Sequence, residues 1–372
     1  MDPARPILRL LFWESTIRCN LACAHCRRLE SDEAAFKDLT TAQAMRLINQ
    51  LAALGAEQPT MPVMVFSGGE PLCREDLFDL MAHARGAGIP VALATNGTLV
   101  DANVARRIAE AGIIRCSVSL DGATPEVHNR LRKLEGSFER ALAGIEHLRR
   151  AGVPFQINMT LTRHNAGQLQ DVYELARRLG AVAVHIFMLV PVGCGQVLGE
   201  MDMLSPQGYE QKMLEICLLD GKGEIQMKVT CGPHYERIIR QQGLHRRPPM
   251  PRTSDVSQRN RPHIPGRTGH QGPSRGCLAG MGVIFVNHEG EVYPCGYLPV
   301  RCGSILRTPL KDIWLGNADL AAMRDSNRLE GKCGVCGYRT VCGGCRGRAY
   351  AATGNYMAEE PFCAYIPPQA IE

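Results

Sequence analysis

Short apolar runs alternate with amphipathic stretches from residue 7 to about residue 190. The apolar runs have the length and composition of strands and fall at residues 8–14, 62–66, 90–94, 114–120, 155–161 and 184–190. The stretches between them have the helical period, at residues 41–54, 75–86, 102–111, 138–151 and 166–179. Thr40 or Thr41 is the predicted N-cap of the first helix, and Gly152 and Gly180 are predicted helix ends. Six β–α units predict an α/β fold with parallel strands and right-handed crossovers.

The pattern changes after about residue 236. The stretch from Glu236 to Arg275 contains nine arginines and six prolines, with Glu236 and Asp255 as its acidic residues. It has few large apolar residues, which predicts a flexible linker or lid. The alternative is an arginine clamp for an anionic substrate, because the guanidinium fork binds carboxylates bidentately. Interleaved aromatic residues for base stacking are missing, so no nucleic-acid partner is expected. We expect three parts of the chain. They are an α/β domain at residues 1–210, a bridging segment at residues 211–275 that contains the arginine-rich stretch, and a cysteine-rich domain at residues 276–372.

Composition narrows the class of protein. A chain of 372 residues has room for two domains, and a formal charge of +5 does not indicate nucleic-acid binding. Sixteen cysteines, several at two-residue spacings, indicate metal binding in a reducing compartment. The first apolar run is too short for a signal peptide and is broken by Arg9, and no stretch has the length of a membrane span. We therefore expect a soluble cytoplasmic protein.

Three cysteines follow the first predicted strand on one short loop. Cys19, Cys23 and Cys26 have spacings of three and two intervening residues. A cubane [4Fe–4S] cluster normally takes four cysteine ligands, so three would leave one iron open to a small molecule. The alternative is a zinc knuckle that uses His25 as its fourth ligand. The spacing favours the cluster, because three ligands within four residues would crowd a zinc ion.

Polar and glycine residues lie at the ends of the next three predicted strands. They form Ser67-Gly68-Gly69-Glu70-Pro71, Thr95-Asn96-Gly97 and Ser117-Val118-Ser119-Leu120-Asp121-Gly122. The carboxyl ends of parallel strands carry the reactive residues of barrels, so these motifs fall where a site is expected. Two glycines allow a close backbone approach, and the Glu70 carboxylate can bind a ligand ammonium. The alternative for each motif is a simple turn at the end of a strand.

A second cysteine system occupies the last hundred residues. Seven cysteines include two Cys-x2-Cys pairs, which is a strong metal-binding pattern: Cys277, Cys295, Cys333, Cys336, Cys342, Cys345 and Cys363. The alternative to iron–sulfur binding is a zinc ribbon.

The three-cysteine loop and the Gly-Gly-Glu-Pro motif resemble the signature of radical S-adenosylmethionine (SAM) enzymes. The resemblance implies a partial (β/α)6 barrel and a [4Fe–4S] cluster on Cys19, Cys23 and Cys26 whose open iron binds SAM. It also implies reductive cleavage of SAM to a radical that abstracts hydrogen. The SAM contacts that it implies are His25, Gly68, Gly69, Glu70, Asn96, Ser119 and Asp121, with His25 against the adenine and Glu70 on the amino group.

The C-terminal cysteines resemble a SPASM domain, which carries one or two auxiliary [4Fe–4S] clusters. The resemblance implies that one cluster is held by Cys333, Cys336, Cys342 and Cys363. It assigns three ligands of a second cluster, namely Cys277, Cys295 and Cys345. Cys231 or Cys302 could supply the eighth ligand, or one iron stays open. The last spacing of the motif is two residues here and three in the family, which leaves the number of clusters undecided.

Four further segments resemble the radical SAM enzymes of the alternative heme pathway, and the heme b synthases most. They are Phe12-Trp13-Glu14, residues 185–193, Cys295-Gly296-Tyr297-Leu298 and residues 342–350. The resemblance implies decarboxylation of two propionates of iron-coproporphyrin III to vinyl groups, with an auxiliary cluster as electron sink and an external electron donor. A His axial ligand to the porphyrin iron would come from His164, His185 or His234. Alternatives are didecarboxysiroheme side-chain removal, heme d1 synthesis, peptide maturation, or an electron carrier without catalysis.

Overall fold

The computed structural model describes residues 5–27, 37–244 and 276–370. Its first six strands are all parallel and each pairs with the next along the chain. They are β1 (Leu10–Glu14), β2 (Val63–Ser67), β3 (Val91–Thr95), β4 (Arg115–Ser119), β5 (Phe155–Leu161) and β6 (Ala183–Met188). The predicted parallel α/β architecture is confirmed, and β5 has the predicted bounds.

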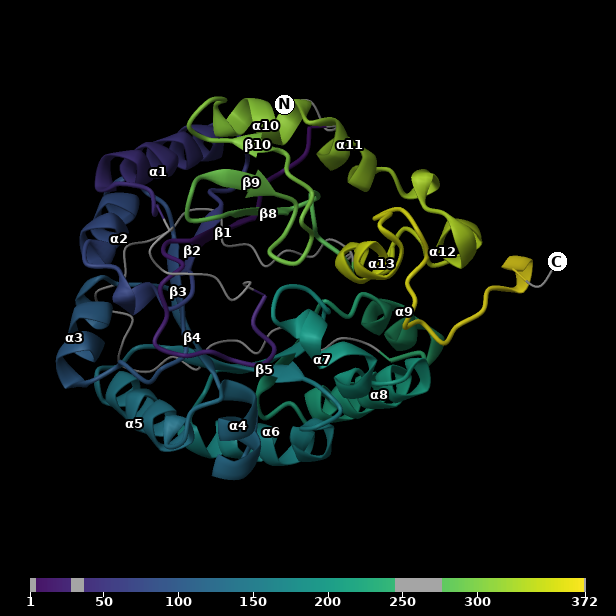
Figure 1. The fold of residues 1–372 in the computed structure, drawn as a ribbon, viewed down its shortest axis with the longest axis horizontal. Coiled ribbons are helices and arrows are strands. Elements are labelled where there is room, and N and C mark those ends of the chain that lie inside the picture. Colours follow the sequence, from purple (N-terminus) through teal and green to yellow (C-terminus); the bar gives the residue numbers. More distant parts are fainter. Residues whose placement is uncertain (1–4, 28–36, 245–275, 371–372) are drawn as a thin grey trace.

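Helices lie along the outer side of these strands (Figure 1). They are α1 (Thr41–Ala56), α2 (Leu77–Gly86), α3 (Ala102–Glu110), α4 (Pro125–Arg132), α5 (Ser137–Arg150) and α6 (Leu169–Leu179). Thr40 begins α1 with a capping box, in which its side chain accepts from Gln43 N, and Gly180 ends α6 with a positive φ of 81°. Both agree with the sequence. The short helix α4 was not predicted, and it carries residues of the site described below.

The sheet continues past the six predicted strands at both edges. On one side β7 (Gln226–Thr230) pairs in parallel with β6. On the other side β8 (Val283–Val286) pairs in parallel with β1, followed by antiparallel β9 (Glu291–Tyr293) and β10 (Gly303–Ser304). The C-terminal region therefore shares one sheet with the first strand of the chain (Figure 1). A local hydrophobic pattern carries no signal for pairing between segments so far apart in sequence.

The remaining helices lie around the outside of the molecule, from the β7 edge of the sheet to the β10 edge (Figure 1). They are α7 (Gly195–Asp202), α8 (Pro206–Lys222), α9 (His234–Gln241), α10 (Leu310–Gly316), α11 (Ala318–Arg324), α12 (Gly331–Val335) and α13 (Arg346–Thr353). Helix α9 includes the beginning of the arginine-rich stretch, where a linker was expected. Residues 245–275, which hold seven of the nine arginines offered for the anion clamp, lie outside the described residues.

The core lies between the strands and the outer helices. Trp13 of β1, Phe66 of β2 and Leu47 of α1 have no solvent exposure, as do Ile157 of β5 and Ile186 of β6. Burial of these side chains fixes which face of each strand meets the helices, because side chains alternate along a strand. The strand ends are thereby held in register, and the loops that follow them converge at one edge. No helix in the described ranges is long and apolar enough to cross a membrane.

Candidate functional site

The loop that carries Cys19, Cys23 and Cys26 leaves the carboxyl end of β1 and packs directly against the loop after β2. Gly69 N donates to Thr16 O at 2.8 Å, and Glu70 N donates to Arg18 O at 2.8 Å. A Cβ atom on Gly68 would lie 2.5 Å from Thr16 O, and one on Gly69 would lie 2.5 Å from Arg18 O. The two glycines are therefore required for the close approach of these backbones. They align the cysteine loop with the end of β2.

Glu70 joins this loop to the end of β3. Its carboxylate accepts hydrogen bonds from Thr95 Oγ1 at 2.7 Å, Asn96 N at 2.8 Å and Leu72 N at 3.2 Å. The side chain is completely buried, and burial raises the pKa of Glu70 to about 7. The carboxylate is thus already supplied with protein donors. The SAM contact predicted for Glu70 stays a prediction.

Asn20, which sequence reasoning did not single out, connects the cysteine loop to the end of β3. Its Oδ1 accepts from Asn96 Nδ2 at 2.8 Å, and its own Nδ2 donates to Thr98 Oγ1 at 2.8 Å. Asn96 Oδ1 in turn accepts from Thr98 N at 2.9 Å. The Asn96 amide is therefore engaged in holding the cysteine loop, within the region where SAM was expected.

His25, Asp121 and Arg132 form a buried polar group beside the cysteines. Arg132 Nη2 lies 2.7 Å from Asp121 Oδ2, and Nη1 of the same guanidinium donates to Cys23 Sγ at 3.7 Å. His25 Nε2 lies 3.4 Å from the same Asp121 oxygen. Burial tends to raise the pKa of Asp121, but the neighbouring Arg132 charge lowers it below its usual value, so the carboxylate is ionised. Burial lowers the pKa of His25 to about 4, so its ring is neutral at pH 7.

Two buried nitrogen atoms of this group have no hydrogen-bond partner in the described residues. They are His25 Nδ1 and Arg132 Nε. Unpaired buried polar atoms are rare, and they indicate a polar ligand that satisfies them. Leu21 N also donates to Cys19 Sγ at 3.4 Å, which suits a thiolate ligand. Ser119 is half-buried at the end of β4, at the same edge. The residues present fit a cluster on three thiolates with a polar ligand beside it.

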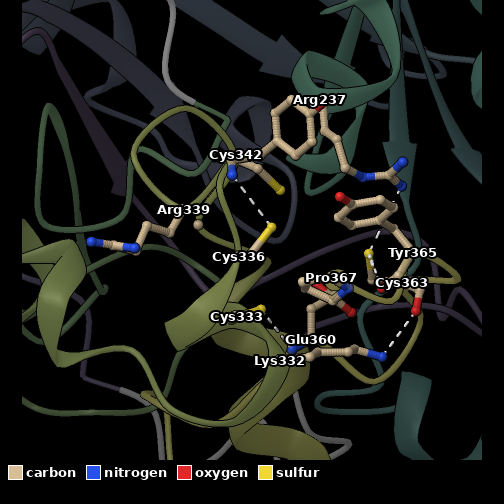
Figure 2. A pocket seen from close by; sticks show the side chains of 13 residues that line it. Arg237, Lys332, Cys333, Cys336, Arg339, Cys342, Glu360, Cys363, Tyr365 and Pro367 are labelled. Carbon is tan, nitrogen blue, oxygen red and sulfur yellow. Dashed lines mark hydrogen bonds between the residues drawn. The ribbon is translucent and has the colours of Figure 1, made fainter. Parts of the chain in front are cut away.

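Four of the C-terminal cysteines line one cavity: Cys333, Cys336, Cys342 and Cys363 (Figure 2). Three of their sulfur atoms accept hydrogen bonds, from Glu360 N at 3.3 Å, Tyr338 N at 3.4 Å and Arg237 Nη2 at 3.8 Å. Hydrogen bonds to cysteine sulfur are characteristic of iron–sulfur sites, where they tune the potential. These four are the residues that the sequence assigned to one cluster, and we retain them as its proposed ligands.

Cys231, on the loop between β7 and α9, lies beside the second cysteine set. The Cys231 thiol shares a hydrogen bond with Cys345, and the nearby Cys295 raises the pKa of Cys231. Cys345 in turn raises the pKa of both Cys277 and Cys295. Cys231 and Cys345 also pack in one small cluster with Val190 and Val192. Cys231 has a φ of 58°, which is unfavourable for a residue other than glycine. Strained backbone of this kind persists where the surroundings impose it, commonly at functional sites.

Cys302 lies elsewhere. Its thiol donates to Val300 O at 3.6 Å, and Asp319 and Arg324 are the charged residues that act on its pKa. Of the two cysteines that the sequence left open, we propose that Cys231 completes the set with Cys277, Cys295 and Cys345. Two sets of four thiolates suit two [4Fe–4S] clusters.

A fully buried ion pair connects the two cysteine sets. Arg348 Nε donates to Glu360 Oε1 at 2.9 Å, and Arg348 Nη2 donates to Glu360 Oε2 at 3.1 Å. Glu360 Oε2 also accepts from Cys345 N at 2.7 Å, while Glu360 N donates to Cys333 Sγ. One residue thus contacts a cysteine of each set. Arg348 Nη1 reaches Leu189 O at 3.4 Å, so the pair also fastens both sets to the end of β6.

The three histidines that were candidate iron ligands lie in different places. His185 is on β6, with Gln156 Nε2 2.9 Å from its Nδ1, and burial lowers its pKa well below the usual value. His234 is completely buried on α9, and neither ring nitrogen has a partner in the described residues. His164 Nε2 likewise lacks one there. The geometry selects none of them as an axial ligand.

Comparison with known proteins places this site in a class. The family model of the Radical SAM superfamily matches residues 13–176, and that of an iron-sulfur cluster-binding domain, SPASM, matches residues 277–337. A crystal structure of Streptococcus suis SuiB bound to S-adenosylmethionine superimposes with a TM-score of 0.70 at 14% identity, covering 97% of this chain and 76% of that one. The fold is thus that of radical SAM/SPASM enzymes.

Relatives with similar sequences define a smaller group within this class. The AdoMet-dependent heme synthase of Methanosarcina barkeri is 43% identical over 96% of this chain and 97% of its own length. The protein of that name from Oleidesulfovibrio alaskensis is 39% identical over 99% and 90%. A pre-heme d1 synthase of Dinoroseobacter shibae is 31% identical over 95% and 85%. The chain therefore belongs to the radical SAM family, in its SPASM-containing heme synthase group. It is an enzyme whose cofactors are SAM and [4Fe–4S] clusters.

Proposed function

We propose that the enzyme converts two propionates of iron-coproporphyrin III to vinyl groups and so produces heme b. The observation that carries the proposal is the 43% identity with an AdoMet-dependent heme synthase over nearly the full length of both chains, both cysteine regions included. Each propionate would lose a hydrogen atom from its β-carbon, then carbon dioxide and one electron. The bound cofactors would supply the hydrogen-abstracting radical and the acceptor for that electron, and an external electron donor is required.

The residues of this chain have separate roles in the proposal. Cys19, Cys23 and Cys26 would hold the SAM-binding cluster, and the unpaired Arg132 Nε and His25 Nδ1 would face the polar groups of SAM. Arg132 carries a positive charge beside Cys23, where an anionic carboxylate of the cofactor would be stabilised. The Glu70 and Asn96 contacts would hold the surrounding loops rigid. Rigid loops are needed because the rate of hydrogen abstraction falls steeply when the abstracting group is misplaced.

The test is an anaerobic turnover of the reconstituted enzyme with SAM, a reductant and iron-coproporphyrin III. Tetrapyrrole mass and 5′-deoxyadenosine are followed together. We expect stepwise loss of two formic-acid equivalents, one for each propionate, with deoxyadenosine formed in step. Deoxyadenosine without any change in the porphyrin would reject this substrate. Didecarboxysiroheme, a heme d1 precursor or a peptide would then be the next substrates to test.

A further inference from the structure

Arg27 lies between the first cysteine loop and the segment that carries Cys295. It directly follows Cys26 in the sequence. Its Cζ is 4.3 Å from the ring centroid of Phe285 on β8. A Cβ atom on Gly296 would lie 3.6 Å from Arg27 Cδ and Nε, which is van der Waals distance, so the arginine lies beside the residue that follows Cys295. The guanidinium is therefore held against an aromatic ring, within one side-chain length of a proposed cluster ligand.

Glu14 and His288 fix the position of this guanidinium. Arg27 Nη2 donates to Glu14 Oε1 at 2.6 Å, and His288 Nδ1 is 2.9 Å from Glu14 Oε2. Burial tends to raise the pKa of Glu14, but the neighbouring Arg27 and His288 hold it at about 2. Burial tends to lower the pKa of His288, while its bond to Glu14 raises it. The Glu14 carboxylate is thus shared between Arg27 and His288, which holds the guanidinium in place.

The guanidinium has capacity for a further acceptor. Within the described residues its hydrogen-bond partner is Glu14, reached through one nitrogen. A guanidinium carries five N–H donors, and its two edges can each bind a carboxylate. The Arg27 side chain is 20% exposed, in contrast to 5% for Glu14. The other titratable groups that act on it are Cys26 and Tyr297, neither of which is a carboxylate.

We propose that Arg27, positioned by Glu14 and His288, binds a propionate carboxylate of the porphyrin substrate. The inference rests on the proposed function and names a specificity-determining residue for it. A carboxylate bound there would lie beside the cysteine loop on one side and beside Tyr297 on the other. Tyr297 packs with Cys231 and Cys345, so the bound substrate would lie between the two cysteine regions. The anion clamp that the sequence offered as an alternative for the arginine-rich stretch would thus have a counterpart at Arg27.

The test is a titration of iron-coproporphyrin III into the anaerobically reconstituted full-length protein with SAM, followed by Soret absorbance. Arg27→Gln should weaken porphyrin binding at least tenfold, because a charge-assisted bidentate bond is lost. Arg27→Lys should bind the porphyrin with an affinity between those of wild type and Arg27→Gln, since lysine keeps the positive charge but lacks the planar guanidinium that binds a carboxylate bidentately. Binding of the porphyrin tetramethyl ester should not differ between Arg27→Gln and wild type, because the ester has no carboxylate.

Arg106→Gln is the matched control, because it removes an exposed arginine of α3 that pairs with Glu110 on the surface. It should bind porphyrin as wild type does. The proposal is overturned if Arg27→Gln binds iron-coproporphyrin III with wild-type affinity, or if its only defect is loss of iron or of SAM binding. A wild-type enzyme that neither binds nor converts iron-coproporphyrin III would instead reject the proposed function. Conversion by wild type with unaltered binding by Arg27→Gln would reject this inference alone.

Discussion

The two cysteine regions are built in opposite ways. Cys19, Cys23 and Cys26 lie within eight residues on one loop, and that loop is fixed by the neighbouring strand ends through Gly69, Glu70 and Asn96. The C-terminal cysteines come from segments between residues 231 and 363, and a buried Arg348–Glu360 pair connects them. The first region is defined by local spacing and the second by tertiary contacts. The second should therefore depend much more on distant substitutions.

The largest expected effect is on the local region. Cys23→Ala should abolish 5′-deoxyadenosine formation, because a cluster on two thiolates of one short loop would not persist. Cys217→Ala on α8 is the control and should retain turnover. Deoxyadenosine produced by Cys23→Ala at the wild-type rate would contradict the assignment of the SAM-binding cluster.

The next largest effect shows which cysteine is the eighth ligand in the C-terminal cysteine region, whose ligands are dispersed along the sequence. Cys231→Ala should leave one iron of an auxiliary cluster without a protein thiolate, whereas Cys302→Ala should leave all of them ligated. Iron content and the Mössbauer spectrum of the reconstituted protein distinguish the two. We expect an altered or lost auxiliary cluster in Cys231→Ala and a wild-type spectrum in Cys302→Ala. The reverse pattern would reject Cys231 as the eighth ligand.

The buried ion pair should carry a large part of the stability of the dispersed region. Glu360→Gln leaves the Arg348 charge buried without its partner, which costs roughly 3–5 kcal/mol. Glu110→Gln removes an exposed carboxylate of α3 and should cost less than about 1 kcal/mol. Urea unfolding under anaerobic conditions, with iron release followed in parallel, measures both. Equal stability of the two variants would mean that the pair does not hold the cysteine sets together.

The smallest effect is a pH dependence in the local region. The pKa of Glu70 is raised to about 7, so the folded state holds a proton that the unfolded state has lost at this pH. The stabilising contribution of Glu70 to the free energy of unfolding is therefore fully present below the ordinary pKa of a glutamate, and it is lost as the pH rises through 7. Between pH 6 and 8 this amounts to about 1.4 kcal/mol. Unfolding free energies at the two pH values should differ by that amount more in wild type than in Glu70→Gln. An identical pH dependence in the two proteins would contradict the raised pKa.

The same contrast explains what the sequence predicts well. Strands and helices of the β–α units follow from local periodicity, and the predicted bounds of β5 and the capping of α1 by Thr40 are confirmed. The strand-end motifs converge because parallel strands place their carboxyl ends at one edge. Pairing of β8 with β1 was missed, because it joins the two ends of the chain.

Side-chain contacts of long sequence separation were also missed. Arg132 reaches Cys23 across 109 residues, and Glu14 meets His288 across 274. Neither pair lies in a recognisable spacing pattern. Glu70 is a different case, because its position was predicted but its contacts were not. The sequence indicates a ligand contact, whereas in the structure the carboxylate accepts hydrogen bonds from Thr95, Asn96 and Leu72. Motif spacing locates such a residue but does not say which atoms its side chain meets.

The most direct test of the account is transfer of deuterium from the substrate. Iron-coproporphyrin III deuterated at the β-carbons of its propionates is incubated anaerobically with the reconstituted enzyme, SAM and a reductant. The account predicts deuterium in 5′-deoxyadenosine, together with a porphyrin that has lost two formic-acid equivalents. Deuterium-free deoxyadenosine beside an unchanged porphyrin would contradict it.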